Sequence, residues 1–94
     1  MRILFVKYSC KKGSRDSFLQ GLSENKIAQI SSEEVGNIRY ELSISIENED
    51  DVLLSEIWEN DSSFENHKKT PHYQKLAELK FLYVEKTDIK KYAL

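Results

Sequence analysis

Four side chains suited to acid–base chemistry and aromatic recognition lie close together in the second half of this chain. They are Glu56, Trp58, His67 and His72. An imidazole has an unperturbed pKa near 6.5, so His67 can accept or release a proton at neutral pH. A neighbouring carboxylate would influence that proton. The residue types therefore predict general acid–base catalysis, with His67 and Glu56 as the candidate catalytic residues.

Each of the four also has a purely structural interpretation. A histidine near an apolar face is often a hydrogen-bonded core residue, which is the alternative for His67. Trp58 can belong to the core, and Glu56 can form an ion pair across a sheet. His72 follows a proline, a position typical of surface or capping residues. These alternatives stay open from the sequence.

Metal and phosphate chemistry find little support in the spacing. His67 and His72 are five apart, which places them on different helical faces and makes them a poor metal pair. The three glycines, at positions 13, 21 and 36, form no glycine-rich phosphate loop. No metal ligands are predicted. For a phosphorylated substrate the obvious cations are few, namely Lys7, Arg39 and Lys68.

Periodicity gives the elements that must position these residues. Alternation of apolar and polar side chains predicts a half-buried strand over 38–46, and a return strand over 52–58 makes a hairpin with it. Thr70-Pro71 predicts a break and a second helix start. The expected order is strand 3–8, helix 14–30 capped by Ser14, strand 38–46, strand 52–58, a second helix and strand 81–92 with a possible interruption at 87–88. Asn60, Asp61 and Ser62 are the N-cap candidates of the second helix, and Ser62-x-x-Glu65 can close a capping box. This helix continues beyond the break to 80.

This order predicts an α+β domain spanning residues 1–94, with two helices on one face of a four-stranded antiparallel sheet. The strand over 38–46 would place five apolar side chains on one face: Ile38, Tyr40, Leu42, Ile44 and Ile46. Such a face needs a cover. A second copy of so small a domain is the natural candidate, so a homodimer packed sheet to sheet is expected.

Composition limits the partners. Net charge is −2 with acidic and basic residues interspersed, so no basic stripe for nucleic acid is present. No apolar run approaches the roughly 20 residues that span a bilayer, so no membrane partner is expected. The single cysteine, Cys10, cannot form an internal disulfide. These features predict a cytoplasmic protein.

Several short motifs, in this order and spacing, resemble the antibiotic biosynthesis monooxygenase (ABM) domain family. The matching residues are Glu34-x-Gly36-Asn37-x-x-Tyr40, Glu56-x-Trp58, Phe64-x-x-His67 and Thr70-Pro71-His72-Tyr73. Two positions depart from related patterns. Val35 stands where the family often has proline, and Ala77 stands where a haem-degrading branch has its iron-binding histidine.

The resemblance implies a ferredoxin-like α+β fold that dimerises into a barrel, with a ligand pocket between sheet and helices. It implies a cofactor-independent monooxygenase that acts on a quinol or similar phenolic compound with dioxygen. His67 would be the base, Glu56 its neighbour, and the substrate contacts would be Tyr40, Trp58, Phe64 and His72. Two alternatives remain: an isomerase of a small, phosphorylated dicarbonyl compound, and a non-catalytic dimeric domain that binds a small ligand.

Overall fold

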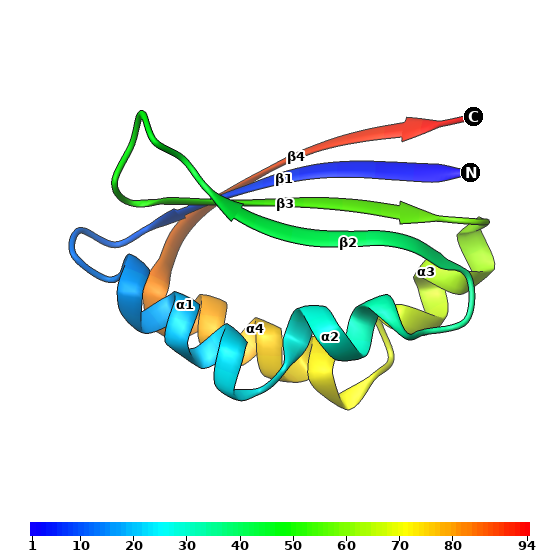
Figure 1. Ribbon diagram of the computed structural model, residues 1–94, viewed down its shortest axis with the longest axis horizontal. Helices are drawn as coiled ribbons and strands as arrows, with labels where there is room; N and C mark the ends of the chain where they lie inside the picture. The colour runs from blue at the N-terminus through cyan, green and yellow to red at the C-terminus, as the bar shows by residue number, and fades with distance from the viewer.

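The computed structural model describes residues 1–94 as a sheet with helices on one side only (Figure 1). The elements in chain order are β1 (Arg2–Cys10), α1 (Arg15–Glu24), α2 (Ile27–Ser32), β2 (Asn37–Ile44), β3 (Asp51–Trp58), α3 (Asp61–His67), α4 (Pro71–Tyr83) and β4 (Val84–Ala93). None of these helices has both the length and the apolar character needed to cross a membrane. This is the expected ferredoxin-like α+β arrangement.

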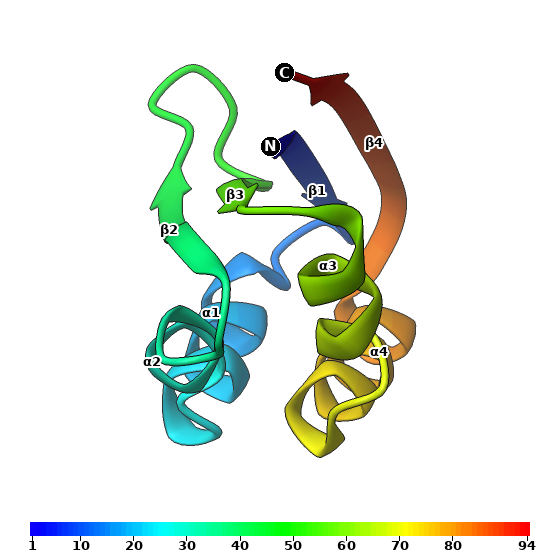
Figure 2. The ribbon, with the colours of Figure 1, turned by 90° about the vertical axis from the view of Figure 1, so that its right-hand side faces the viewer.

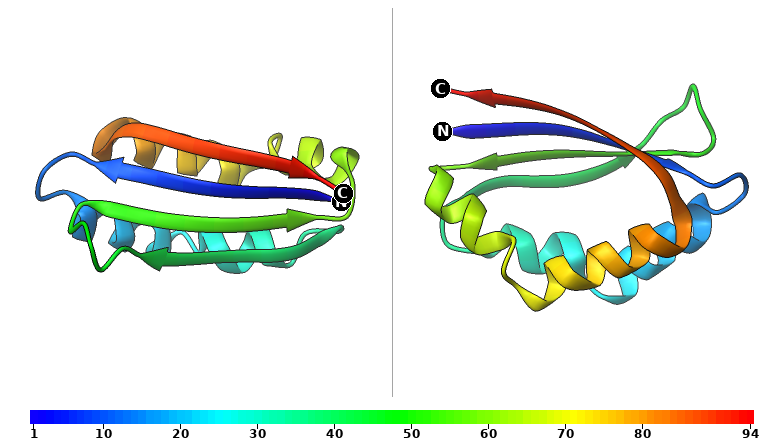
Figure 3. Two further views of the ribbon diagram at one scale, coloured as in Figure 1. Left: turned by 90° about the horizontal axis from the view of Figure 1, so that it is seen from above. Right: turned by 180° about the vertical axis from the view of Figure 1, so that it is seen from behind.

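The sheet is antiparallel and has the order β2-β3-β1-β4, so β1 and β3 are its inner strands. Figures 2 and 3 show all four helices beneath the same face, with the opposite face free of other elements. Because side chains alternate along a strand, one face of β1 carries Leu4, Val6 and Tyr8 toward the helices. These three residues are part of the hydrophobic core.

The predicted hairpin of β2 and β3 is confirmed, and the apolar side of β2 is turned toward the helices of the same chain. Tyr40 is opposite Glu56 and Leu42 is opposite Leu54, so they face the helices of the same chain. Ile46 lies beyond the strand and is 98% exposed. The helices of the same chain therefore cover only the middle of this face, since Ile38 and Ile44 are 51% and 48% exposed, and the homodimer stays a prediction.

The first helix is split where one continuous helix was expected. Lys26 adopts a left-handed backbone conformation, with φ of 51°, which ends α1 and redirects the chain into α2. Ser14 takes the N-cap position, but its side chain makes no capping hydrogen bond. No glycine or proline marks this break. Because the apolar positions keep their helical spacing across it, the sequence predicted one helix.

Helix α3 begins at one of its three expected N-caps. Asn60 takes that position, and its side chain accepts a hydrogen bond from the Ser63 N–H, whereas Ser62 lies inside the helix and forms no capping box. At the other end, α4 runs to Tyr83 although Phe81-Leu82-Tyr83 is β-favouring. Strand β4 then continues without interruption through Thr87.

The break at Thr70-Pro71 is confirmed and sets the direction of α4. The Thr70 hydroxyl accepts a hydrogen bond from the Tyr73 N–H, and Pro71 occupies the first turn, where its missing N–H costs nothing. The same hydroxyl donates to the carbonyl oxygen of His67 at 2.7 Å. One side chain therefore joins the end of α3 to the start of α4.

Candidate active site

The imidazole of His67 lies at the centre of the candidate site and is 1% exposed. It is the last residue of α3, where the short helix turns it under the sheet. Four aromatic rings surround it, those of Tyr40, Trp58, Phe64 and Tyr73, with centroids between 4.7 and 6.4 Å from its own. Such an enclosure removes water from around the ring.

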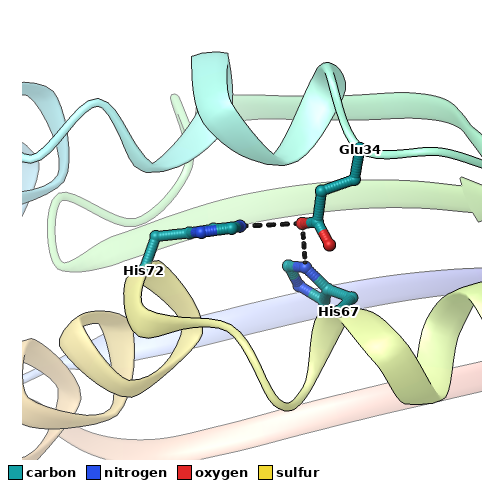
Figure 4. A group of neighbouring side chains, drawn as sticks. All are labelled: Glu34, His67 and His72. Carbon is teal, nitrogen blue, oxygen red and sulfur yellow. Dashed lines mark hydrogen bonds and ion pairs between the residues drawn. The ribbon is translucent and has the colours of Figure 1, made fainter.

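One edge of this imidazole contacts Glu34. The Nδ1 atom lies 2.5 Å from Glu34 Oε2, and the Nε2 atom of His72 approaches the same oxygen at 2.7 Å (Figure 4). An ionised carboxylate only accepts hydrogen bonds, so Nδ1 of His67 carries the hydrogen. In the neutral ring the Nε2 atom is then unprotonated and can act as a base.

The loop that carries Glu34 is held against the end of β3 by Gly36. This glycine has φ of +85°, and a Cβ there would overlap the Ser63 hydroxyl on α3. Its carbonyl accepts a hydrogen bond from the Glu59 N–H at 2.8 Å. Only glycine combines that backbone conformation with so close an approach. The Glu34 side chain is thereby fixed beside the two histidines.

The opposite edge of the His67 ring faces Glu56. The distance from Nε2 to Glu56 Oε1 is 3.9 Å, and the same oxygen accepts a hydrogen bond from Trp58 Nε1 at 3.1 Å. Burial raises the pKa of Glu56 to about 7, and the Trp58 hydrogen bond opposes that rise. Burial also lowers the pKa of His67, against the contrary effect of Glu34. Near neutral pH, therefore, His67 is uncharged.

A cavity of about 210 Å³ lies between the sheet and α4. Four of the predicted site residues line it, namely His67, Glu56, Tyr40 and Phe64. Glu34 is outside this lining, so the Nε2 edge of His67 is the one turned toward the cavity. The volume is below the roughly 300–1,000 Å³ typical of sites for drug-sized ligands, so it suits a compound of one or two rings.

Trp58 and His72 were expected to contact substrate, and neither lines the cavity. Trp58 is fully buried behind Glu56, in accordance with its structural alternative. His72 lies on the far side of Glu34 and also contacts the Thr70 hydroxyl at 3.3 Å. Trp58 therefore contacts Glu56 and His72 contacts Glu34, and neither contacts the cavity that a ligand would occupy.

The prediction that His67 and His72 lie on different helical faces and stay apart was wrong. The break between α3 and α4 places both ring nitrogens on one oxygen of Glu34. These three donor atoms lie within 4.8 Å of one another and could hold a metal ion. Ligand atoms around tetrahedral Zn²⁺ are about 3.3 Å apart, so the 2.5 and 2.7 Å contacts have hydrogen-bond lengths and the carboxylate would have to withdraw to admit an ion.

Two residues of the site carried no predicted role. Glu34 belongs to the Glu34-x-Gly36 motif, but the sequence gives no sign that it reaches residues more than thirty positions away. Lys80 was expected only as part of its helix, yet its side chain lines the cavity. The only sequence evidence for this position is a lysine at the edge of the apolar face of a helix, and such evidence is weak.

The chain belongs to the antibiotic biosynthesis monooxygenase family, whose model matches residues 1–79. A search of curated proteins finds no match. Among solved structures, a protein from Nitrosomonas europaea named for this family superposes with a TM-score of 0.89 at 22% identity, covering 99% of this chain and 97% of that one. A family protein from Deinococcus radiodurans gives 0.84 at 26% identity, covering 100% and 92%.

Proposed function

We propose that this protein is a monooxygenase that uses no cofactor and acts on a small quinol or related phenolic compound bound in the cavity. The observation that carries the proposal is the arrangement of His67, with one ring nitrogen held by Glu34 and the other directed toward an enclosed space. Membership of the monooxygenase family agrees with it. Independently of the substrate, the chain has the fold of this family and a candidate acid–base site.

The proposed reaction begins with proton transfer from a substrate hydroxyl or activated carbon to Nε2 of His67. Glu34 stabilises the imidazolium that forms, since the Nδ1 hydrogen bond becomes an ion pair. The resulting anion is electron-rich and gives its electrons to dioxygen. One oxygen atom enters the substrate and the other leaves as water, with the substrate supplying every electron. Enclosure by the aromatic rings keeps bulk water from the anion.

Glu56 and Tyr40 are placed to act on the same proton transfer. The pKa of Glu56 near 7 leaves a substantial protonated fraction, which can donate a hydrogen bond to an oxygen of the ligand. Burial raises the pKa of Tyr40, so its hydroxyl stays protonated as a second donor. Trp58 holds Glu56 through its indole N–H. His72 holds Glu34.

The proposal is tested by oxygen uptake with a panel of reduced naphthoquinones, corrected for uncatalysed oxidation. A positioned base contributes roughly 10²–10⁴-fold, so His67→Gln should reduce the rate by at least about a hundredfold. Glu34→Gln should reduce it about tenfold or more. Glu33→Gln, which changes the exposed neighbouring carboxylate, is the matched control and should leave it unchanged.

Thermal unfolding of each variant separates loss of chemistry from loss of fold. A folded His67→Gln variant as fast as the wild type would refute the assignment of the base. The absence of uptake by the wild type with every quinol would refute the monooxygenase.

One observation favours the isomerase as a second candidate. In the sequence, few cations were obvious partners for an anionic substrate, which disfavoured the isomerase. Lys7 and Arg39 do lie away from the cavity, but Lys68, Lys80 and Lys91 all line it. In an isomerase His67 would move a proton between the carbons of a dicarbonyl compound. Deuterium exchange at an α-carbon without oxygen uptake would identify this activity.

A further inference from the structure

The strand register defines the two ends of the cavity, and they differ in their charged groups: Glu56 and the exposed Lys91, both opposite Leu4, belong to the end next to His67. Leu4 is opposite Glu56 and marks the end next to His67, whereas Tyr8 is opposite Thr87 and marks the other. Four residues of extended strand separate Leu4 from Tyr8, or roughly 13 Å. Helix α4 follows the same direction, with Tyr73 beside His67.

Lys80 lies at the end remote from His67. It comes seven residues after Tyr73 on α4, about 10 Å along the helix axis. Its Nζ atom lies 5.3 Å from the centroid of the Tyr8 ring, and both residues line the cavity together with Thr87. The three side chains come from α4, β1 and β4, so the whole fold brings them together.

The charge of Lys80 has no carboxylate to balance it. It takes part in none of the ion pairs of the structure, in contrast to Lys75 on the same helix, which pairs with Glu78. Among the 15 residues lining the cavity Glu56 is the only carboxylate, and it belongs to the opposite end. Half-burial of the ammonium lowers the pKa of Lys80. An unpaired cation in a partly dehydrated position attracts an anion strongly.

We infer that the end of the cavity formed by Lys80, Tyr8 and Thr87 binds an anionic oxygen group of the ligand. The ligand is then a small cyclic or enolic compound with two functional oxygens. One is held near His67 and reacts, and the other is an acidic enol, carboxylate or phosphate held by Lys80 some distance away. The inference rests on the proposed function in treating this cavity as the substrate site.

The position of the anion subsite also affects the chemistry. Removing a proton at the His67 end leaves a negative charge that spreads through a conjugated ring. A fixed ammonium at the far end stabilises that charge as it develops. Lys80 would therefore act both in selecting the substrate and in promoting its ionisation.

The test is a binding measurement that needs no turnover. The probes are 2-hydroxy-1,4-naphthoquinone, an enolate at neutral pH, and its neutral 2-methoxy ether, titrated calorimetrically against the full chain. The wild type should bind the enolate at least about tenfold more tightly. Lys80→Met should remove this preference with little change for the ether, and Lys80→Arg should keep most of it. Lys75→Met removes the same charge from the solvent side of α4 and should behave as the wild type.

Benzoate and phenyl phosphate, titrated in the same way, distinguish a carboxylate from a phosphate as the preferred anion. Equal affinity of the wild type for enolate and ether would overturn the inference, as would a preference that a folded Lys80→Met variant retains. If the enolate binds through Lys80 but no quinol consumes oxygen, the anion subsite stands and the monooxygenase proposal fails. If quinols consume oxygen but the protein shows no preference for anions, the monooxygenase proposal stands and the anion subsite fails.

Discussion

At the scale of single residues, the site depends on two carboxyl groups with different environments, the partly buried Glu34 and the buried Glu56. Glu34 shares one oxygen between two imidazoles, and that contact fixes which nitrogen of His67 is free. Glu56 faces the free nitrogen and has only the Trp58 indole as a hydrogen-bond donor. Burial therefore raises the pKa of Glu56 to about 7. In the proposed mechanism, Glu34 orients the base and Glu56 donates a hydrogen bond near neutral pH.

The raised pKa of Glu56 has a consequence for stability. A carboxyl group that holds its proton more tightly when folded stabilises the protein below its unfolded pKa of about 4.5, and this contribution is lost as the pH rises through about 7. Glu56→Gln should remove that loss and still accept the Trp58 hydrogen bond.

Relative to the wild type, the Glu56→Gln variant should gain about 2–3 kcal/mol in free energy of unfolding at pH 8, with little gain at pH 4.5. Urea unfolding at the two pH values measures this difference. Glu59→Gln, which changes an exposed carboxylate at the end of the same strand, should show no such pH dependence. A Glu56→Gln variant with the same stability as the wild type at both pH values would show that Glu56 ionises normally.

At the scale of elements, the breaks in the helices decide which residues meet. The break at Thr70-Pro71 could be predicted, because a capping residue followed by proline is a local signal. The convergence of His67 and His72 on Glu34, which this break permits, could not be predicted. It depends on the packing of α3 against the α2–β2 loop. The break at Lys26 left no local signal, because a lysine with positive φ is uncommon.

The strands were predicted more successfully than the helices for a physical reason. Alternation over β2 predicted that Tyr40 and Leu42 share a face, and both pack on the helix side of the sheet, where Tyr40 is directly opposite Glu56. Local alternation carries no information about long-range contacts. Glu34 and Lys80 reach the site only through tertiary packing, and neither could be assigned from its neighbours in sequence.

The Thr70 hydroxyl provides a test at this scale. It caps α4 and also binds the carbonyl oxygen of His67, so Thr70→Ala loses these two hydrogen bonds together with the 3.3 Å contact to His72. Loss of an N-cap alone costs about 1 kcal/mol, and the variant should be destabilised by about 1–2 kcal/mol in urea unfolding. Thr70→Ser keeps the hydroxyl and should remain within about 0.5 kcal/mol of the wild type. Equal losses in both variants would mean that the methyl group, not the hydroxyl, matters.

At the scale of the whole molecule, the helices enclose a cavity on one face of the sheet and leave the other face open (Figure 3). Only 17 of 94 residues are buried, which is a thin core for a domain of this length. The open face carries the half-exposed rings of Phe5 and Tyr92, which contact each other edge to face. A second copy packed on this open face stays a prediction, now with a different surface from the one that the β2 pattern indicated.

In the proposed site Glu34 holds His67 as a neutral base, with Nδ1 protonated and Nε2 free toward the cavity. Nitrogen-15 NMR of the imidazole rings measures this directly, with the His72→Gln variant used to assign the two histidines. At pH 7.5 the account predicts a protonated Nδ1 and an unprotonated Nε2 for His67, and a mixed or inverted tautomer in Glu34→Gln. A wild-type ring that is protonated on Nε2, or doubly protonated at this pH, would contradict it.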